Sequence, residues 1–366
     1  MPAVGKASGK LSHAVWWTAL SIALFLLMDG ALFHSGWYNK YVEPDSTTGQ
    51  VEYRLFWLRH TIPPRPPEVL VIGDSRIAEG FSARVAEDTV ESKVHFTNLG
   101  MPGTSPRVWY YTLRDADPER NRFAAIAIAM DRYSDQDEED PSEWLPDLNY
   151  LAGRLRFSDC WGFSGSYPTS ELRRRVFTGC IFRGAVFRPD VLGLLSGYRA
   201  RIDHAADWRN NGARYNAAYT GKPEDLTGLS ADWAGRILHF TPDATEGQMT
   251  TTRRAVFPDP APQTGALTAY RQRWLGGIVD LYRNSSTRII FFPLPRAPLP
   301  ILDSPVPARF LMSVAGRPHI SLLDRKTFRD LERPDEFADG LHLNHNGRPL
   351  FSARLAQRLA AIVDGH

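Results

Sequence analysis

The sequence predicts an α/β protein in which helices cover both faces of a parallel β-sheet, preceded by one membrane-spanning helix. Short continuous runs of β-branched and aliphatic residues, typical of buried strands, recur along the chain. Patterns with helical periodicity separate these runs, as in parallel sheets whose strands are joined by crossover helices. A single long apolar run lies near the N-terminus.

The composition is that of a globular protein. The 366 residues are 43% hydrophobic and 23% charged, which excludes a disordered chain, a collagen-like chain and a small disulfide-stapled domain. Lys and Arg number 43 against 41 Asp and Glu, for a formal net charge of +2. The arginines are spread along the chain instead of forming a basic stripe, so the sequence does not favour a nucleic-acid partner.

Residues 14–33 form the apolar run, AVWWTALSIALFLLMDGALF, with Asp29 as the one charged residue. About 20 apolar residues cross a bilayer. Lys6 and Lys10 precede the run, so the positive-inside rule places the N-terminus in the cytoplasm and the main domain outside. A cleaved signal peptide is the alternative, but its apolar region is shorter and ends at a small-residue cleavage site. Asp29 meets a partner helix or, as the simpler expectation, interfacial water.

The rest of the chain follows in order. After a polar and aromatic stretch with four closely spaced prolines, buried strands are expected at residues 69–72, 94–96, 124–130, 288–292 and 320–323. Helices are expected at residues 106–114, 267–282 and 348–363. The apolar residues of the second helix fall on one face, which we expect to pack on the sheet. These residues are Leu267, Tyr270, Trp274, Ile278 and Leu281.

Residues 134–263 contain few periodic runs and are too long for a plain connection, so they are interpreted as an insertion that forms a cap or a partner surface. Cys160 and Cys180 lie within it, and their spacing matches no zinc pattern. They form either one bridge, which an extracytoplasmic location permits, or two buried thiols. The predicted divisions are a cytoplasmic tail at 1–13, a transmembrane helix at 14–33, a juxtamembrane linker at 34–68, and a sheet domain at 69–133 and 264–366 interrupted by the insertion.

The first expected strand runs directly into Gly73-Asp74-Ser75-Arg76, just before an expected helix. Reactive groups of open α/β sheets lie at this carboxyl edge, which would display Ser75 there. A serine hydroxyl becomes a good nucleophile only when a base takes its proton, and a carboxylate orients that base. Asp339 and His342, three residues apart, supply this pair. His345 is a second histidine nearby, but it has no aspartate three residues before it.

The segment Asn98-Leu99-Gly100-Met101-Pro102-Gly103 follows the second expected strand. Its glycines allow backbone N–H groups to approach a substrate closely, as an oxyanion hole requires. The amides of Ser75 and Gly100 are the two expected donors.

These motifs resemble those of the SGNH, or GDSL-type, hydrolase superfamily. The GDS at 73–75, the glycine at Gly100 and the D-x-x-H ending at His342 match its first, second and last blocks. The resemblance covers about residues 69–133 and 264–362 and does not reach the insertion. It implies a flavodoxin-like three-layer α/β/α sandwich with Ser75 as nucleophile, His342 as base and Asp339 as its orienting carboxylate. It implies no metal and no organic cofactor.

One block departs from the family pattern. Members commonly carry an asparagine after the third strand that donates to the oxyanion, whereas Asp131 stands here, followed by Arg132. An ionised aspartate would repel a developing oxyanion. We therefore expect Asp131 to be a strand-end residue, to pair with Arg132 or, together with Arg76, to contact substrate.

Combined with the membrane helix, the resemblance implies a function at the cell envelope. Single-pass proteins with an extracytoplasmic SGNH domain include the polysaccharide acylation proteins that acetylate alginate or transfer D-alanine to teichoic acid beside a polytopic membrane-bound O-acyltransferase. The expectation is an O-acyltransferase, anchored in the inner (cytoplasmic) membrane and facing the periplasm, that moves a small acyl group, with acetyl expected, onto a surface glycan.

Two alternatives stay open. One is an anchored esterase or deacetylase with the same residues and water as acceptor. The other is a non-catalytic scaffold or carbohydrate-binding module, which would form no acyl-serine. Aromatic residues of the insertion either stack on sugar faces or form a small core of their own. These are Trp144, Trp161, Tyr167 and Trp208.

Overall fold

The computed structural model describes residues 8–61, 66–130, 146–211, 219–258, 266–301 and 308–365. The chain forms two compact units. The helical unit comprises Met1–Glu52 and Leu148–Trp208, and the sheet unit comprises Tyr53–Asp147 and Arg209–His366.

The sheet unit is built on five parallel strands in the order β2-β1-β3-β6-β7. The strands are β1 (Glu68–Gly73), β2 (His95–Gly100), β3 (Ala125–Met130), β6 (Arg288–Pro293) and β7 (Ile320–Leu322). Every residue of β1 and β3 is buried, which explains why these strands are continuous apolar runs in the sequence. The predicted α/β class and parallel sheet are confirmed.

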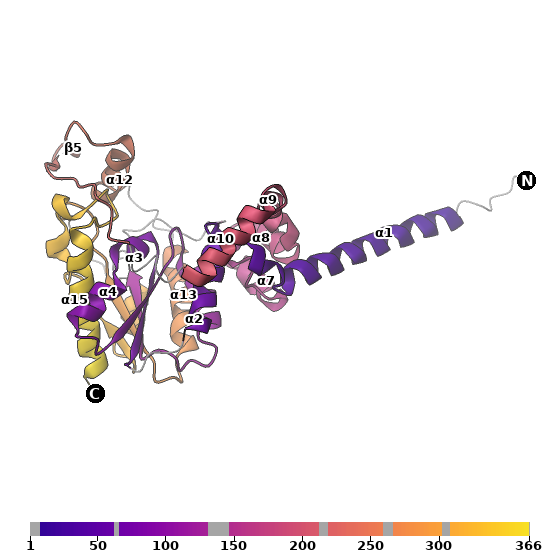
Figure 1. Ribbon diagram of the computed structural model, residues 1–366, viewed down its shortest axis with the longest axis horizontal. Coiled ribbons are helices and arrows are strands. Elements are labelled where there is room, and N and C mark those ends of the chain that lie inside the picture. Colours follow the sequence, from indigo (N-terminus) through magenta and orange to yellow (C-terminus); the bar gives the residue numbers. More distant parts are fainter. Residues whose placement is uncertain are drawn as a thin grey trace, which may run out of the picture. The chain divides into compact units, whose positions relative to one another are not determined.

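Helices cover this sheet on both sides. On one side, α15 (Gly347–Asp364) packs on α3 (Ser75–Gly80) and α4 (Ala83–Thr89). On the other, α13 (Ala266–Leu281) packs on α5 (Pro106–Ala116) and α14 (Arg309–Val314). Figure 1 shows α15 and α13 on opposite sides of the sheet. The face of α13 predicted to pack inward is buried at Leu267, Tyr270, Trp274 and Ile278.

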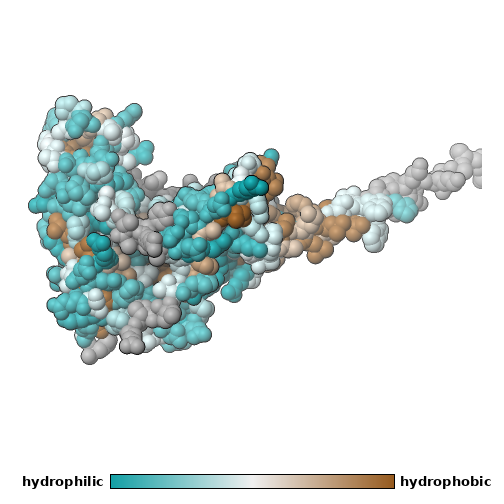
Figure 2. Space-filling view, in the orientation of Figure 1, coloured by the Kyte–Doolittle hydropathy of each residue, from teal (hydrophilic) through white to brown (hydrophobic). Residues whose placement is uncertain are grey.

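The N-terminal helix α1 (Ser8–Asp29) continues into a π-helical turn, η1 (Gly30–His34). Val15–His34 is long and apolar enough to cross a membrane, and only 6% of its most apolar window is buried within the protein. Figure 2 shows hydrophobic surface along this helix. The predicted N-terminal apolar helix is therefore present.

Asp29, at the end of this helix, is buried in the protein rather than exposed to solvent. Only 4% of its surface is exposed, and its carboxylate accepts hydrogen bonds from the backbone N–H groups of Arg183 and Gly184, at 3.2 and 2.7 Å. The expectation of interfacial water is wrong. The reason is that a helix of the same unit begins at Arg183, and its free N–H groups need an acceptor.

The region predicted to be a juxtamembrane linker contains regular structure. A 3₁₀ turn, η2 (Tyr38–Tyr41), and helix α2 (Thr47–His60) lie within it. Val51, Leu55 and Leu58 are spaced by four and three residues, form one apolar stripe along α2, and are buried. The expected linker is therefore corrected to a helix that belongs to the fold.

The predicted insertion also divides differently. Its first half carries α6 (Pro146–Leu151), α7 (Phe157–Ser164), α8 (Ser170–Ile181), α9 (Arg183–Ser196) and α10 (Tyr198–Asn211). Residues 148–208 belong to the helical unit, where Ala152 and Phe187 share a core with Phe33, Tyr38 and Val42. Cys160 and Cys180 form a disulfide between α7 and α8.

The second half of the predicted insertion belongs to the sheet unit. It carries a hairpin of β4 (Ser230–Asp232) and β5 (Ile237–His239), followed by α12 (Glu246–Val256). Its apolar residues Leu226, Leu229, Leu238 and Val256 enter the same core as the strands. Two 3₁₀ turns, η4 (Arg329–Leu331) and η5 (Pro334–Glu336), lead into the C-terminal part of this unit.

Candidate active site

Ser75 is the first residue of α3, immediately beyond the carboxyl end of β1. Asp74 caps the helix, because its side chain accepts a hydrogen bond of 2.9 Å from the backbone N–H of Arg76. The chain therefore turns sharply from strand to helix and presents the Ser75 side chain at the sheet edge.

The short helix α3 is also held at its far end. The buried amide of Asn98 donates to the carbonyls of Ile77 and Phe81, at 3.0 and 2.8 Å. The Arg348 guanidinium donates to the carbonyl of Glu79 at 2.8 Å. Six residues of helix alone would be marginal, so these tertiary contacts fix the position of the Ser75 backbone.

The loop that carries His342 is organised by the side chain of Asp339. Oδ1 of Asp339 accepts the backbone N–H groups of Leu341 and His342, at 2.8 and 2.9 Å. At Gly340 the loop runs against α12 so closely that an added Cβ would lie 2.4 Å from the carbonyl carbon of Thr251. The loop is thus fixed both by its own aspartate and by a neighbouring helix.

Ser75, His342 and Asp339 form one hydrogen-bonded chain. The Ser75 hydroxyl oxygen lies 2.9 Å from His342 Nε2, and His342 Nδ1 lies 2.9 Å from Asp339 Oδ2. Burial alone would raise the pKa of Asp339, but hydrogen bonds from the His342 ring and from backbone N–H groups lower it to about 2. An ionised carboxylate can only accept hydrogen bonds, so His342 Nδ1 carries the proton. His342 Nε2 then accepts a hydrogen bond from the Ser75 hydroxyl.

The second expected oxyanion donor, Gly100, is placed differently from the expectation. Its backbone N–H donates to Asn98 Oδ1 at 2.8 Å, so this amide is already satisfied. The glycine has another role here, since a Cβ would lie 2.2 Å from the backbone nitrogen of Ala78 in α3. Gly100 therefore permits the close approach of β2 to the helix that carries Ser75.

The other expected oxyanion donor is the backbone N–H of Ser75. Among the described residues no acceptor contacts this N–H, so it is available to a substrate.

Of the two residues expected to bind substrate, Arg76 is described by the structure and Asp131 is not. The Arg76 guanidinium bonds the Asp74 carboxylate, with Nη2 2.6 Å from Oδ2. Burial would raise the pKa of Asp74, but this ion pair holds it below its usual range. Arg76 thus acts on the cap of α3, next to Ser75. Asp131 and Trp144 lie outside the described residues.

The other expected sugar-stacking aromatics belong to the helical unit. Tyr167 is fully buried, as the alternative of a small core predicts. The indole N–H of Trp208 donates to His204, and the Trp161 side chain is 78% exposed. Of these three side chains, only Trp161 is largely exposed.

Lys222 is a residue of the site that the sequence reasoning missed. Its ammonium lies 2.9 Å from the Glu79 carboxylate and 3.7 Å from Oδ2 of Asp339. Burial would lower the pKa of Lys222, but the bond to Glu79 and the charge of Asp339 raise it, so it is cationic at neutral pH. The backbone carbonyl of Lys222 accepts the His345 N–H at 2.9 Å. His345 therefore anchors this segment, while His342 faces the serine.

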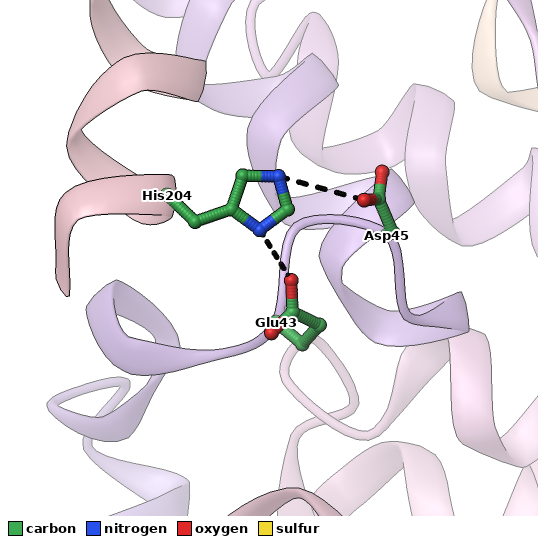
Figure 3. Close-up of side chains that lie close together, drawn as sticks. All are labelled: Glu43, Asp45 and His204. Carbon is green, nitrogen blue, oxygen red and sulfur yellow. Dashed lines mark hydrogen bonds and ion pairs between the residues drawn. The ribbon is translucent and has the colours of Figure 1, made fainter. Parts of the chain in front are cut away.

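A second group of titratable side chains lies in the helical unit, where Glu43 and Asp45 point toward His204 (Figure 3). Nδ1 of His204 lies 2.6 Å from Glu43, and Nε2 lies 3.5 Å from Asp45. These residue types suit a metal ion, but Arg201 already pairs with Glu43 at 2.6 Å and Trp208 donates to Nε2. We assign the group a structural role, joining the turn before α2 to α10.

No family model matches this chain, and no curated protein is similar enough to count as a relative. The site is therefore interpreted from its own geometry and chemistry.

Proposed function

We propose that the protein is a serine-dependent O-acyltransferase that carries a small acyl group, acetyl being the simplest, on Ser75 and passes it to a hydroxyl of a cell-surface glycan. The observation that carries the proposal is the chain of hydrogen bonds from the Ser75 hydroxyl through His342 to Asp339. Three side chains up to 267 residues apart in sequence meet with the donor and acceptor order that nucleophilic catalysis needs.

The fold supports the same assignment. Numbered along the chain, the sheet strands follow the order 2-1-3-4-5, which is the flavodoxin-like order of doubly wound sheets. An SGNH-type sandwich has this arrangement, with the nucleophile after the first strand and the D-x-x-H before the last helix. Here Ser75 follows β1, and Asp339 and His342 precede α15.

The chemistry proceeds in two steps. The Ser75 oxygen attacks the acyl carbonyl of the donor while His342 Nε2 takes the hydroxyl proton, and the Ser75 N–H stabilises the oxyanion. Collapse expels the donor's leaving group, which takes the proton from His342, and leaves an acyl ester on Ser75. The acceptor hydroxyl then gives its proton to Nε2 and attacks this ester, which releases the acylated product and restores the serine.

The membrane helix favours transfer to a glycan over hydrolysis of a soluble ester. A helix such as α1 keeps the site at one surface, where an acyl donor delivered by a polytopic membrane-bound O-acyltransferase and an envelope polysaccharide would both be found. With the N-terminus in the cytoplasm, the site lies outside the inner membrane, in the periplasm. An esterase with the same triad is the second candidate and differs only in accepting water.

The nucleophile is tested with a serine-directed phosphonate probe. We expect the probe to label the wild-type protein at Ser75 and to leave Ser75→Ala unlabelled, with mass spectrometry of the labelled peptide as the measurement. Ser313→Ala, which removes an exposed serine on α14, is the matched control and should be labelled normally. Labelling of Ser75→Ala at the wild-type rate would refute the assignment.

The acceptor is tested by giving the full chain an acetyl ester with and without an oligosaccharide. A transferase should acetylate the sugar and consume the ester faster when the sugar is present. An unchanged rate of acetate release, with no acetylated sugar, would identify the esterase instead. A protein that forms no acyl-serine with any ester would be the scaffold.

A further inference from the structure

The helical unit carries a row of aromatic side chains that the proposed reaction does not use. Phe157 and Trp161 are four residues apart on α7, so they lie on the same helix face, and they are 56% and 78% exposed. The ring of Trp161 meets that of Phe177 on α8, with 5.5 Å between centroids. Arg174, exposed and one turn before Phe177, extends the row. We call these four residues the aromatic strip.

The strip is built on a rigid support. The Cys160–Cys180 disulfide joins α7 to α8, with 5.6 Å between the two Cα atoms. Both cysteines are buried, and Cys160 directly precedes Trp161. The bridge therefore fixes the two helices behind the strip while the strip itself faces outward. Exposing two large aromatic side chains on a locked surface costs solvation free energy in water, which suggests a contact surface.

The strip begins where the membrane-spanning segment ends. His34, the last residue of that segment, stacks on Phe157 with 3.8 Å between ring centroids. Its Nε2 also lies 3.0 Å from the carbonyl oxygen of Ile181, the last residue of α8. Both strip-bearing helices are thus attached to the same residue at the membrane exit of the chain.

A further ring contact reaches inside the span. Phe182, which follows α8, lies 6.1 Å from Phe25 between ring centroids. Phe25 precedes His34 by nine residues, or about 13 Å of helix. The Phe182 side chain therefore contacts the apolar segment itself, so the end of α8 is joined to that segment at a second point.

We infer that the aromatic strip is a membrane-docking surface and lies in the headgroup layer of the bilayer that α1 crosses. Tryptophan and other amphipathic aromatic side chains are stabilised in this layer. The arginine would pair with anionic phosphate, and its neighbours on α8, Arg173 and Arg175, are exposed as well. The inference requires α1 to span a membrane and does not depend on the acyl-transfer chemistry.

The test uses the full chain in nanodiscs that contain phosphatidylcholine and phosphatidylglycerol, with bromine atoms placed near the headgroup end of the acyl chains. Bromine quenches tryptophan emission only at short range. The emission of Trp161 is obtained as the difference between the wild type and Trp161→Tyr. Trp233, 49% exposed in the β4–β5 hairpin, is the matched control, measured with Trp233→Tyr.

We expect the brominated lipids to reduce the Trp161 emission at least twofold and to leave the Trp233 emission unchanged, with iodide in the water quenching in the opposite order. Trp161 emission that responds to iodide as Trp233 does, and not to brominated lipid, would overturn the inference and leave the strip as a surface for a protein partner. Arg174→Gln should weaken the lipid quenching only when phosphatidylglycerol is present. Equal weakening in phosphatidylcholine alone would contradict the role of the charge.

Discussion

Replacing Gly100 by alanine should displace the helix that carries Ser75 and so disable the candidate site. The added Cβ would lie 2.2 Å from the Ala78 nitrogen and 2.7 Å from both Ala78 Cα and the Ile77 carbonyl carbon. All three are backbone atoms of α3, so no side chain can rotate out of the way. Reaching an ordinary contact of 3.4 Å requires a displacement of about 1.2 Å between β2 and the helix that carries Ser75.

Two effects follow from that displacement. Overpacking of this kind costs about 1–3 kcal/mol of unfolding free energy. The Ser75 oxygen, now 2.9 Å from His342 Nε2, would move out of hydrogen-bond reach, and a misplacement of about 1 Å can reduce a rate about 100-fold. We therefore expect Gly100→Ala to lose nucleophile reactivity under conditions where most of the protein is still folded.

The assay follows the rate of phosphonate labelling of Ser75 alongside the urea midpoint of unfolding. Gly276→Ala on α13 is the control and should label normally, because the added Cβ would meet nothing closer than 3.7 Å. If Gly100→Ala labels at the wild-type rate and unfolds at the wild-type midpoint, then the close approach of β2 to α3 does not position Ser75, and the reasoning is wrong.

Four further predictions concern Asp339, Lys222 and the disulfide. Asp339→Asn should slow labelling of Ser75 about 10⁴-fold, as expected when the imidazole loses the carboxylate that selects its tautomer. The pKa of Asp339 is lowered from 3.8 to about 2, so its ionised form stabilises the fold by about 2 kcal/mol above pH 4. This stabilisation is lost as the pH falls toward 2. Over that range the urea midpoint of the wild type should decline more steeply than that of the asparagine variant. Lys222→Met should move the acid loss of stability that depends on Asp339 to higher pH, because the Lys222 ammonium, 3.7 Å from Asp339 Oδ2, favours the ionised carboxylate. The effect should be about 1 kcal/mol or less for so exposed a pair, and Lys222→Arg should behave as wild type. An unmoved stability profile in Lys222→Met would remove Lys222 from the site. Cys160 and Cys180 are 20 residues apart in sequence, and replacing both by serine should lower the unfolding free energy of the helical unit by about 3 kcal/mol. Calorimetry should show that this unit unfolds at a lower temperature while Ser75 labels normally. Loss of labelling would show that the stability of one unit affects the other.

The strands and the triad were predictable because each has a strong local signal. A buried parallel strand is a continuous apolar run, and β1 and β3 are buried at every residue. Ser75 follows such a run directly, and Asp339 reaches His342 across three residues within one loop. Each of these signals lies within a few neighbouring residues, whereas the meeting of Ser75 with His342, 267 residues away, was inferred from the base that a serine nucleophile needs.

The parts that were missed depend on distant neighbours or on weak patterns. Lys222 reaches Asp339 because a β-bridge pairs Lys222 with Asn344, far along the chain, and no local pattern marks this contact. Helix α2 carries a stripe of only three buried aliphatic residues, which is easily read as a linker. The use of the Gly100 amide could have been anticipated, because asparagine side chains commonly bond the N–H two residues ahead, as Asn98 does.

The contact between Gly340 and α12 bears on how the sheet unit could be made smaller. Residues 219–258 carry only a short hairpin and one helix, so they would be an obvious segment to delete when a smaller domain is wanted. Its helix, however, is the wall against which the histidine loop rests, with an added methyl group unable to fit between them. A sheet unit trimmed in this way would lose the position of His342 along with the segment, and a failure to label Ser75 would then report a displaced loop.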